Sequence, residues 1–204
     1  MTKVDFKKEF KYLYSPSSTT PEVVDVPPLD FLMIDGHGDP NVAPAYREAI
    51  EALYAVAYAL KFMSKRQLDR DYTVPPSEGL WWAADMAAFS LAHKSDWDWT
   101  MMIMQPSWIT PEMLQAAIAD TAARKPLPAL ALLRSEVYHE GPSAQIMHIG
   151  PWAAEGPTIA RLHAFLQEQG YVPAGKHHEI YISDPNRTTP ERMKTVVRQP
   201  VRPR

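Results

Sequence analysis

The chain has 204 residues, of which 46% are hydrophobic and 22% are charged, and its formal net charge is −3 at pH 7. This length suffices for a substantial hydrophobic core without covalent reinforcement. A slightly acidic chain has no overall attraction to polyanions, so we expect no nucleic-acid partner. Because the sequence contains no cysteine, a disulfide framework, a thiol nucleophile and a thiolate metal site are excluded.

Two further features of the sequence bear on location and on ligands. The N-terminal segment has no apolar stretch of signal-peptide length, and no uninterrupted apolar run of about 18 residues occurs. We therefore expect a cytoplasmic protein with no membrane partner. Six Trp, nine Tyr and ten Met are present, and such side chains suit an adaptable apolar pocket.

Residues 1–28 are predicted to form an N-terminal arm ahead of a single domain over residues 29–204. The arm combines charged residues with a turn-forming stretch at residues 15–18 and ends at Pro27-Pro28. It is too short and too interrupted by proline to form a DNA-binding helix-turn-helix.

The first half of the domain reads as strand, helix, strand, strand. An apolar run over residues 31–36 predicts a strand, and apolar residues at three- and four-residue steps over about 43–64 predict a long helix. Two more strands are predicted over about 78–85 and 97–105. A capping threonine and a proline at Thr110-Pro111 then predict the start of another helix.

The second half repeats this order after a predicted hairpin. The hairpin would pair residues 129–138 with 144–149 through a turn at 140–142. A helix is predicted from Gly156 to its stop at Gly170, and strands are predicted over about 177–183 and 194–201.

The repeated order predicts an α+β fold of two modules, over about residues 29–110 and 129–204. Each module would place its helix on one face of an antiparallel sheet. Two such modules side by side would leave a groove along their junction, which is a natural site for a small-molecule ligand.

The predicted strand at residues 177–183 has different chemistry on its two faces. Side chains alternate along a strand, so Ile180 and Ile182 share a core face, whereas Glu179 and Tyr181 share the other. A carboxylate in apolar surroundings finds partners, shifts its pKa or awaits a ligand. Glu179 is therefore the first functional candidate.

Several segments, taken in order and spacing, resemble the GyrI-like family of small-molecule-binding proteins, in its stand-alone branch. These segments are 27–31, 53–63, 78–82, 145–151, 178–181 and 194–198, so the resemblance covers nearly the whole chain. It implies tandem β-α-β-β (SHS2-like) modules and a ligand-contacting acidic residue at Glu179. Some members of this branch are cyclopropanoid hydrolases, which open the cyclopropane of DNA-alkylating compounds inside an aromatic cage. General-base assistance of about 10²- to 10⁴-fold is enough for such a strained substrate, so we expect no cofactor.

For that reaction, Glu179 would deprotonate or orient the attacking water. Tyr181 would hold the carboxylate or donate to the developing oxyanion. The structural alternative is a carboxylate that neighbouring Tyr or Arg groups satisfy.

Flat apolar or aromatic ligands require aromatic walls. The residues predicted to supply them, from elements that would border the groove, are Trp81, Trp108, Tyr138, Tyr54 and Tyr58. Each is equally suited to ordinary core packing.

The histidines do not indicate a metal site. His177 and His178 are adjacent on a strand and so point to opposite faces, and no HExxH spacing occurs. His148 lies in a predicted strand and suits a hydrogen-bonded structural role.

Three functions remain open from the sequence. The first is hydrolysis of electrophilic xenobiotics with Glu179 as base. The second is sequestration of apolar or cationic drugs, with Glu179 as counter-charge and the aromatic residues as cation-π walls. The third is contact with another macromolecule through a sheet edge, which the many aromatic residues make the least favoured.

Overall fold

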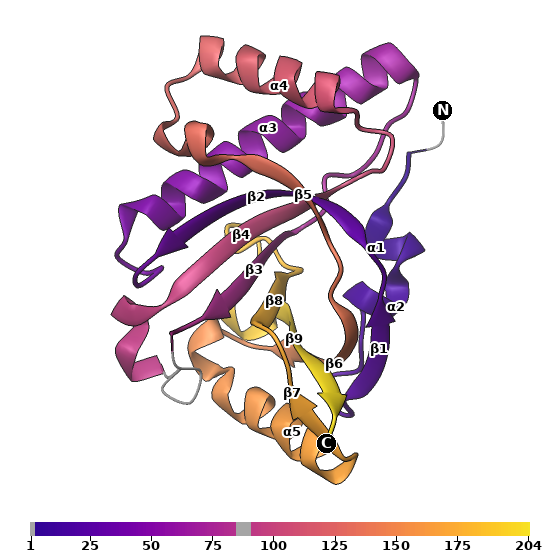
Figure 1. Cartoon of the computed structure of the whole chain (residues 1–204), viewed down its shortest axis with the longest axis vertical. Helices are drawn as coiled ribbons and strands as arrows, with labels where there is room; N and C mark the ends of the chain where they lie inside the picture. The colour runs from indigo at the N-terminus through magenta and orange to yellow at the C-terminus, as the bar shows by residue number, and fades with distance from the viewer. Residues whose placement is uncertain (1–2, 85–90) are drawn as a thin grey trace. The chain divides into compact units, whose positions relative to one another are not determined.

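The computed structural model describes residues 3–84 and 91–204 (Figure 1). The chain divides into two compact units. The first contains Leu29–Ser77 and Trp81–Tyr138 together with the N-terminal residues up to Phe6. The second contains Lys7–Pro28, Glu78–Leu80 and His139–Arg204. Both units are α+β and antiparallel.

The first unit is built on a four-stranded antiparallel arrangement with the strand order β3-β4-β2-β5. Its elements are β2 (Leu29–His37), α3 (Pro44–Leu68), β3 (Ser77–Trp82), β4 (Asp98–Gln105), α4 (Pro111–Arg124) and β5 (Arg134–Tyr138), except that residues 78–80 of β3 belong to the second unit. Figure 1 shows α3 and α4 together on one side of β2 and β4.

The apolar face of α3 that the sequence predicts is buried. Ala49, Leu53, Val56 and Leu60 have no exposed surface in the structure. Removing four such side chains from water is the main favourable contribution of this helix to folding. The predicted helix over 43–64 is therefore confirmed, although it continues one turn further.

One close contact fixes the pairing of β2 with β4. Gly36 lies opposite Trp99, and a Cβ atom at position 36 would overlap the indole ring. Glycine is required here because the ring lies directly over the backbone.

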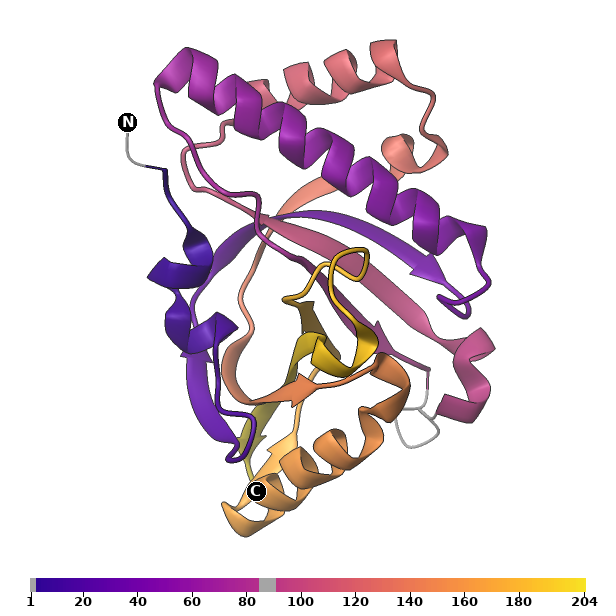
Figure 2. The same ribbon diagram turned by 180° about the vertical axis from the view of Figure 1, so that it is seen from behind.

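The second unit has the strand order β1-β6-β9-β8, and β7 pairs with the far end of β9. Its elements are α1 (Phe6–Glu9), α2 (Lys11–Tyr14), β1 (Glu22–Val26), β6 (Gly141–Ile149), α5 (Gly156–Glu168), β7 (Tyr171–Pro173), β8 (His177–Tyr181) and β9 (Lys194–Pro203). Helix α5 covers one face of these strands (Figure 2). The core under it is formed by Ala144, Ile146, Leu162, Leu166, Val197 and Val201.

The predicted β-α-β-β order is confirmed in the first unit as β2-α3-β3-β4, and in the second as β6-α5-β8-β9 with the unpredicted short strand β7 between α5 and β8. The segment predicted as an arm contains two short helices and β1, which adds to the edge of β6. The predicted strand over 78–85 is β3, which ends at Trp82; its predicted end at Asp85 lies outside the described residues.

The predicted hairpin of residues 129–138 with 144–149 is wrong. Residues 128–132 form a 3₁₀ helix, β5 pairs with β2, and β6 pairs with β1 and β9. The burial patterns explain the difference. β5 is mostly exposed and suits a sheet edge, whereas β6 is buried over most of its length and needs a neighbour on each side.

Candidate functional site

Strand β8 presents two chemically different faces, as its sequence predicts. In the register with β9, Glu179 lies opposite Val197 and Tyr181 lies opposite Thr195. Val197 belongs to the core under α5. Glu179 and Tyr181 therefore lie on the α5 face of the sheet, and His178 lies on the opposite face.

The carboxylate of Glu179 has hydrogen-bond partners on both oxygens. His177 Nε2 lies 3.2 Å from Oε1, and the Tyr181 hydroxyl donates to Oε2 over 2.9 Å. The Glu179 side chain remains 16% exposed. Strand alternation explains the arrangement, because residues 177, 179 and 181 share one face. The result is a held carboxylate that is not sealed from solvent.

A second carboxyl group joins this site from the N-terminus of α5. The buried side chain of Glu155 hydrogen-bonds the carboxylate of Glu179. Burial would raise the pKa of Glu179, but the hydrogen bonds and charge of His177, with the hydrogen bonds of Tyr181 and Glu155, bring that pKa below its ordinary value. Glu179 is therefore ionised at neutral pH.

Two neighbours complete the α5 face around Tyr181. The ring of Trp152 meets the Tyr181 ring edge-on, with 5.7 Å between centroids, and the Trp152 side chain is 43% exposed. The hydroxyl of Thr195 is buried and has no hydrogen-bond partner in the part of the chain that the structure describes. A buried hydroxyl without a partner is costly, so a ligand that accepts a hydrogen bond from it would be favoured.

His148 has a hydrogen-bond partner at each of its ring nitrogens. His148 Nδ1 lies 3.0 Å from the Thr158 hydroxyl and Nε2 lies 3.2 Å from the Pro151 carbonyl, so the predicted structural role is confirmed. Among residues 3–84 and 91–204, no group of three or more His, Asp or Glu is placed to hold a metal ion.

The opposite face of β8 carries a buried ion network centred on His178. Its ring nitrogens lie 2.9 Å from a Glu140 oxygen and 3.0 Å from a Glu78 oxygen. Burial would lower the pKa of His178, but the charges and hydrogen bonds of Glu140 and Glu78 raise it to about 9. His178 is therefore an imidazolium that donates from both nitrogens.

The other charges of this network are also compensated. Arg198 donates to the second oxygen of Glu140 over 3.1 Å and to Gln145 and a backbone carbonyl. Tyr14 donates to the second oxygen of Glu78 over 3.0 Å. Burial would raise the pKa of Glu140, but His178 and Arg198 lower it. Two cations thus neutralise two carboxylates, which indicates a structural cluster.

The five aromatic residues predicted as walls all lie in the first unit. Tyr54 and Tyr58 are in ring contact at 6.3 Å, and the Tyr54 hydroxyl accepts from the Ser77 amide. Trp81 is buried against Tyr46 and Trp97, Trp108 packs on Phe6 and Tyr72, and Tyr138 meets Phe31 edge-on. The predicted common cage of these five residues stays a prediction.

Sequence reasoning missed three contributors to these two faces. Glu155 could have been noted because it directly precedes the predicted helix start at Gly156-Pro157. Trp152 lies just ahead of it. No local sequence pattern marks Glu140 as a site residue, because it lies in the segment predicted as a turn and its partners are distant in sequence.

The paired β-α-β-β units and the held Glu179 carboxylate agree with what the sequence resemblance implies for a small-molecule-binding protein. The model of the GyrI-like small molecule binding domain matches residues 19–202, so the chain belongs to the GyrI-like family. A search of curated proteins found no match.

Solved structures from Listeria innocua are similar over nearly the whole chain. An uncharacterized conserved protein is 41% identical with a TM-score of 0.91, and a hydrolase is 40% identical with a TM-score of 0.88. A further structure of a hydrolase is 39% identical with a TM-score of 0.85. In each comparison, 98% of this chain and 100% of the other are covered.

Among the described residues, no helix has the length and apolar character needed to cross a membrane.

Proposed function

We propose that this protein hydrolyses cyclopropane-bearing, DNA-alkylating compounds by water attack that Glu179 assists. The observation that carries the proposal is the ionised, partly exposed Glu179 carboxylate, held by Tyr181 and His177. The similarity to hydrolases at about 40% identity supports a hydrolytic activity.

In the proposed reaction, water forms a C–O bond to a cyclopropane carbon while the strained C–C bond breaks. The electron pair of that bond moves into the conjugated carbonyl, whose oxygen then takes up a proton. Glu179 accepts hydrogen bonding from the water and receives its proton.

Tyr181 acts on this reaction through Glu179. Its hydroxyl donates to the oxygen that His177 does not contact, which leaves the carboxylate in a fixed orientation toward the attacking water. Trp152, packed edge-on against Tyr181, supplies an exposed aromatic surface beside the carboxylate. A planar substrate would stack on such a surface.

The second candidate function is binding without turnover. An ionised carboxylate next to an exposed indole is also a suitable counter-charge and wall for a cationic aromatic drug. In this case Glu179 would contribute to affinity and no product would form. Quenching of tryptophan fluorescence by a planar ligand would test separately whether the predicted wall residues Trp81 and Trp108 contact a ligand.

The test is incubation with a cyclopropane-bearing dienone, followed by mass spectrometry for the addition of one water. We expect turnover by the native protein and a loss of about 10²- to 10⁴-fold in Glu179→Gln. Neutral planar ligands should still bind that variant, because the aromatic surfaces remain.

The matched control is Glu168→Gln, which makes the same chemical change at the exposed end of α5. It should retain full turnover. If the native protein yields no hydrated product and Glu179→Gln weakens cationic ligands more than neutral ones, the binding function replaces the hydrolytic one. Unchanged turnover and affinity in Glu179→Gln would remove both.

A further inference from the structure

A pocket opens on the loop between β8 and β9, on the face of the sheet opposite Glu179. Its volume is about 370 Å³, and its lining comprises Ile149, Arg187, Thr188, Thr189, Arg192 and Lys194. In the β6–β9 register, Ile149 lies opposite Lys194, and the next residue, Thr195, lies on the Glu179 face. Strand alternation therefore separates this pocket from the candidate site.

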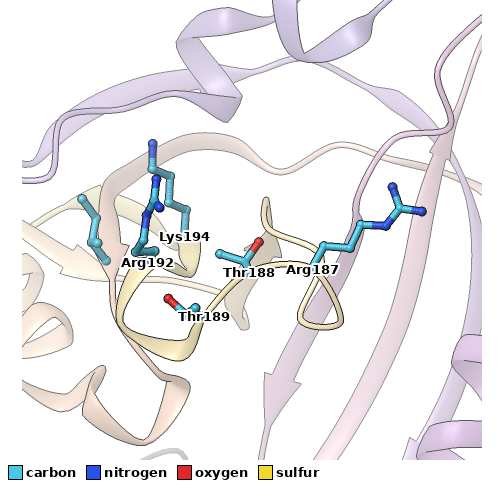
Figure 3. A pocket seen from close by; sticks show the side chains of 6 residues that line it. Arg187, Thr188, Thr189, Arg192 and Lys194 are labelled. Atoms are coloured by element: carbon cyan, nitrogen blue, oxygen red, sulfur yellow. The ribbon is translucent and has the colours of Figure 1, made fainter.

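The pocket gathers polar donors that the protein leaves without partners. Arg192 and Lys194 form no ion pair within the described residues. The hydroxyls of Thr188 and Thr189 likewise have no side-chain hydrogen bond there. In Figure 3, the side chains of Arg192 and Lys194 extend in the same direction. Two cations and two hydroxyls thus adjoin one open volume.

Arg187 differs from the other two cations. Its Nε lies 3.4 Å from the Asp184 carboxylate, and Figure 3 shows its side chain extending to the other side of the loop. The pocket is lined by no carboxylate. In a chain with a net charge of −3, a pocket whose charged lining residues are all basic is a local reversal of charge that favours an anion.

The loop that carries these donors is fixed by its own hydrogen bonds. The Thr188 amide donates to the Asp184 carbonyl over 3.0 Å, and the Arg192 amide donates to the Thr189 carbonyl over 2.9 Å. The Lys194 amide donates to the Ser183 hydroxyl over 3.0 Å. Because the backbone is ordered before a ligand arrives, less entropy is lost on binding.

We propose that this pocket binds the phosphate group of a small phosphorylated molecule. Arginine matches phosphate oxygens in pairs, lysine adds a point charge, and threonine hydroxyls donate to the remaining oxygens. A carboxylate has two oxygens and would leave most of these donors unused. The volume exceeds that of a phosphate group alone and falls within the range of small-molecule pockets, so it leaves room for an organic part against Ile149.

Isothermal titration calorimetry of the full chain at constant ionic strength tests the proposal, with inorganic phosphate, phenyl phosphate and acetate as probes. Saturable binding with one site is expected for both phosphates, tighter for phenyl phosphate, and none for acetate. Arg192→Ala and Lys194→Ala should each weaken phosphate binding by about tenfold or more, since each removes a charge-assisted contact. Both positions are exposed, so circular dichroism should show unchanged folding.

Arg202→Ala is the matched control, because it removes an equal charge from an exposed side chain of β9 that is not part of the pocket lining. Its phosphate affinity should stay within about twofold of the native value. Equal losses in all three variants, or acetate binding as tight as phosphate, would show simple charge attraction and overturn the proposal. Tighter binding of a short single-stranded DNA than of phenyl phosphate would overturn it in favour of a nucleic-acid surface.

Discussion

The two faces of β8 place charged groups under opposite conditions. On one face, His178 is sealed between Glu78 and Glu140, and each of these groups is almost completely buried. On the other, Glu179 is partly exposed and its neighbours are a histidine, a phenol and a second carboxyl group. A charge that is fully paired and buried inside the protein cannot form a further interaction with a ligand. We therefore propose a functional role for the Glu179 face and a structural role for the His178 face.

The comparison also explains why adjacent residues have such different roles. Burying an ion costs several kcal/mol, so an enclosed cluster must balance its charges to be tolerated. The His178 cluster does so with two cations and two carboxylates. The Glu179 carboxylate keeps contact with solvent and is held by His177, Tyr181 and Glu155 rather than enclosed between two buried cations.

Removing one charge from the balanced cluster should have the largest effect. Glu140→Gln would leave His178 and Arg198 buried without sufficient counter-charge. We expect a loss of about 3–5 kcal/mol in the free energy of unfolding, measured by urea denaturation. Glu168→Gln on exposed α5 surface should change it by less than about 0.5 kcal/mol. A similarly small change in Glu140→Gln would mean that this cluster is not structural.

Stability should decrease as the pH rises from about 6.5 to about 9. In this window the folded protein keeps the proton on His178, whose pKa is about 9, while the unfolded chain loses it near its ordinary value of about 6.5. The contribution is complete below pH ~6.5 and is lost through pH ~9, at most roughly 3 kcal/mol.

At acidic pH, the lowered pKa of Glu140 affects the stability of the fold. Its contribution is present above the ordinary carboxyl pKa of about 4.3 and is lost as the pH falls through the lower folded value. Urea denaturation across the pH range should therefore give maximal stability between about pH 4.5 and 6.5. A curve that is flat or rises from pH ~6.5 to ~9 would contradict a charged His178.

Tyr181→Phe should alter the Glu179 face without the loss of stability expected for Glu140→Gln. The change removes one hydrogen bond to the carboxylate, which is worth about 0.5–1.5 kcal/mol. The pKa of Glu179 should rise, so the acidic limb of the pH profile of kcat/KM should move to higher pH, with a loss of about tenfold or less in rate. If the profile does not move, Tyr181 does not act through Glu179.

Thr195→Val should have the smallest effect on stability, and in the opposite direction to Glu140→Gln. The buried Thr195 hydroxyl has no partner among the described residues, so replacing it with a methyl group should leave the free energy of unfolding unchanged or raise it by up to about 1 kcal/mol. If a ligand uses the hydroxyl, the same variant should bind that ligand more weakly. Thr195→Ser keeps the donor and should retain affinity. A destabilised Thr195→Val with unchanged affinity would show that the hydroxyl is satisfied within the fold.

Local sequence was sufficient for the repeated β-α-β-β order and for the alternation of β8. The periodicity of α3 and the separation of Ile180 from Glu179 and Tyr181 follow from backbone geometry over a few residues. The same alternation places residues 177, 179 and 181 on one face, where their side chains hydrogen-bond one another.

Only the tertiary structure decided which strands pair and which charges meet. β5 and β6 follow each other closely in sequence, yet each finds its partners elsewhere, because pairing depends on the burial that a strand needs on both sides. Glu78 and His178 are separated by 100 positions, and no local pattern marks two such residues as partners. Their meeting depends on how distant strands bring buried polar groups together, since each buried charge must find compensation wherever the fold provides it.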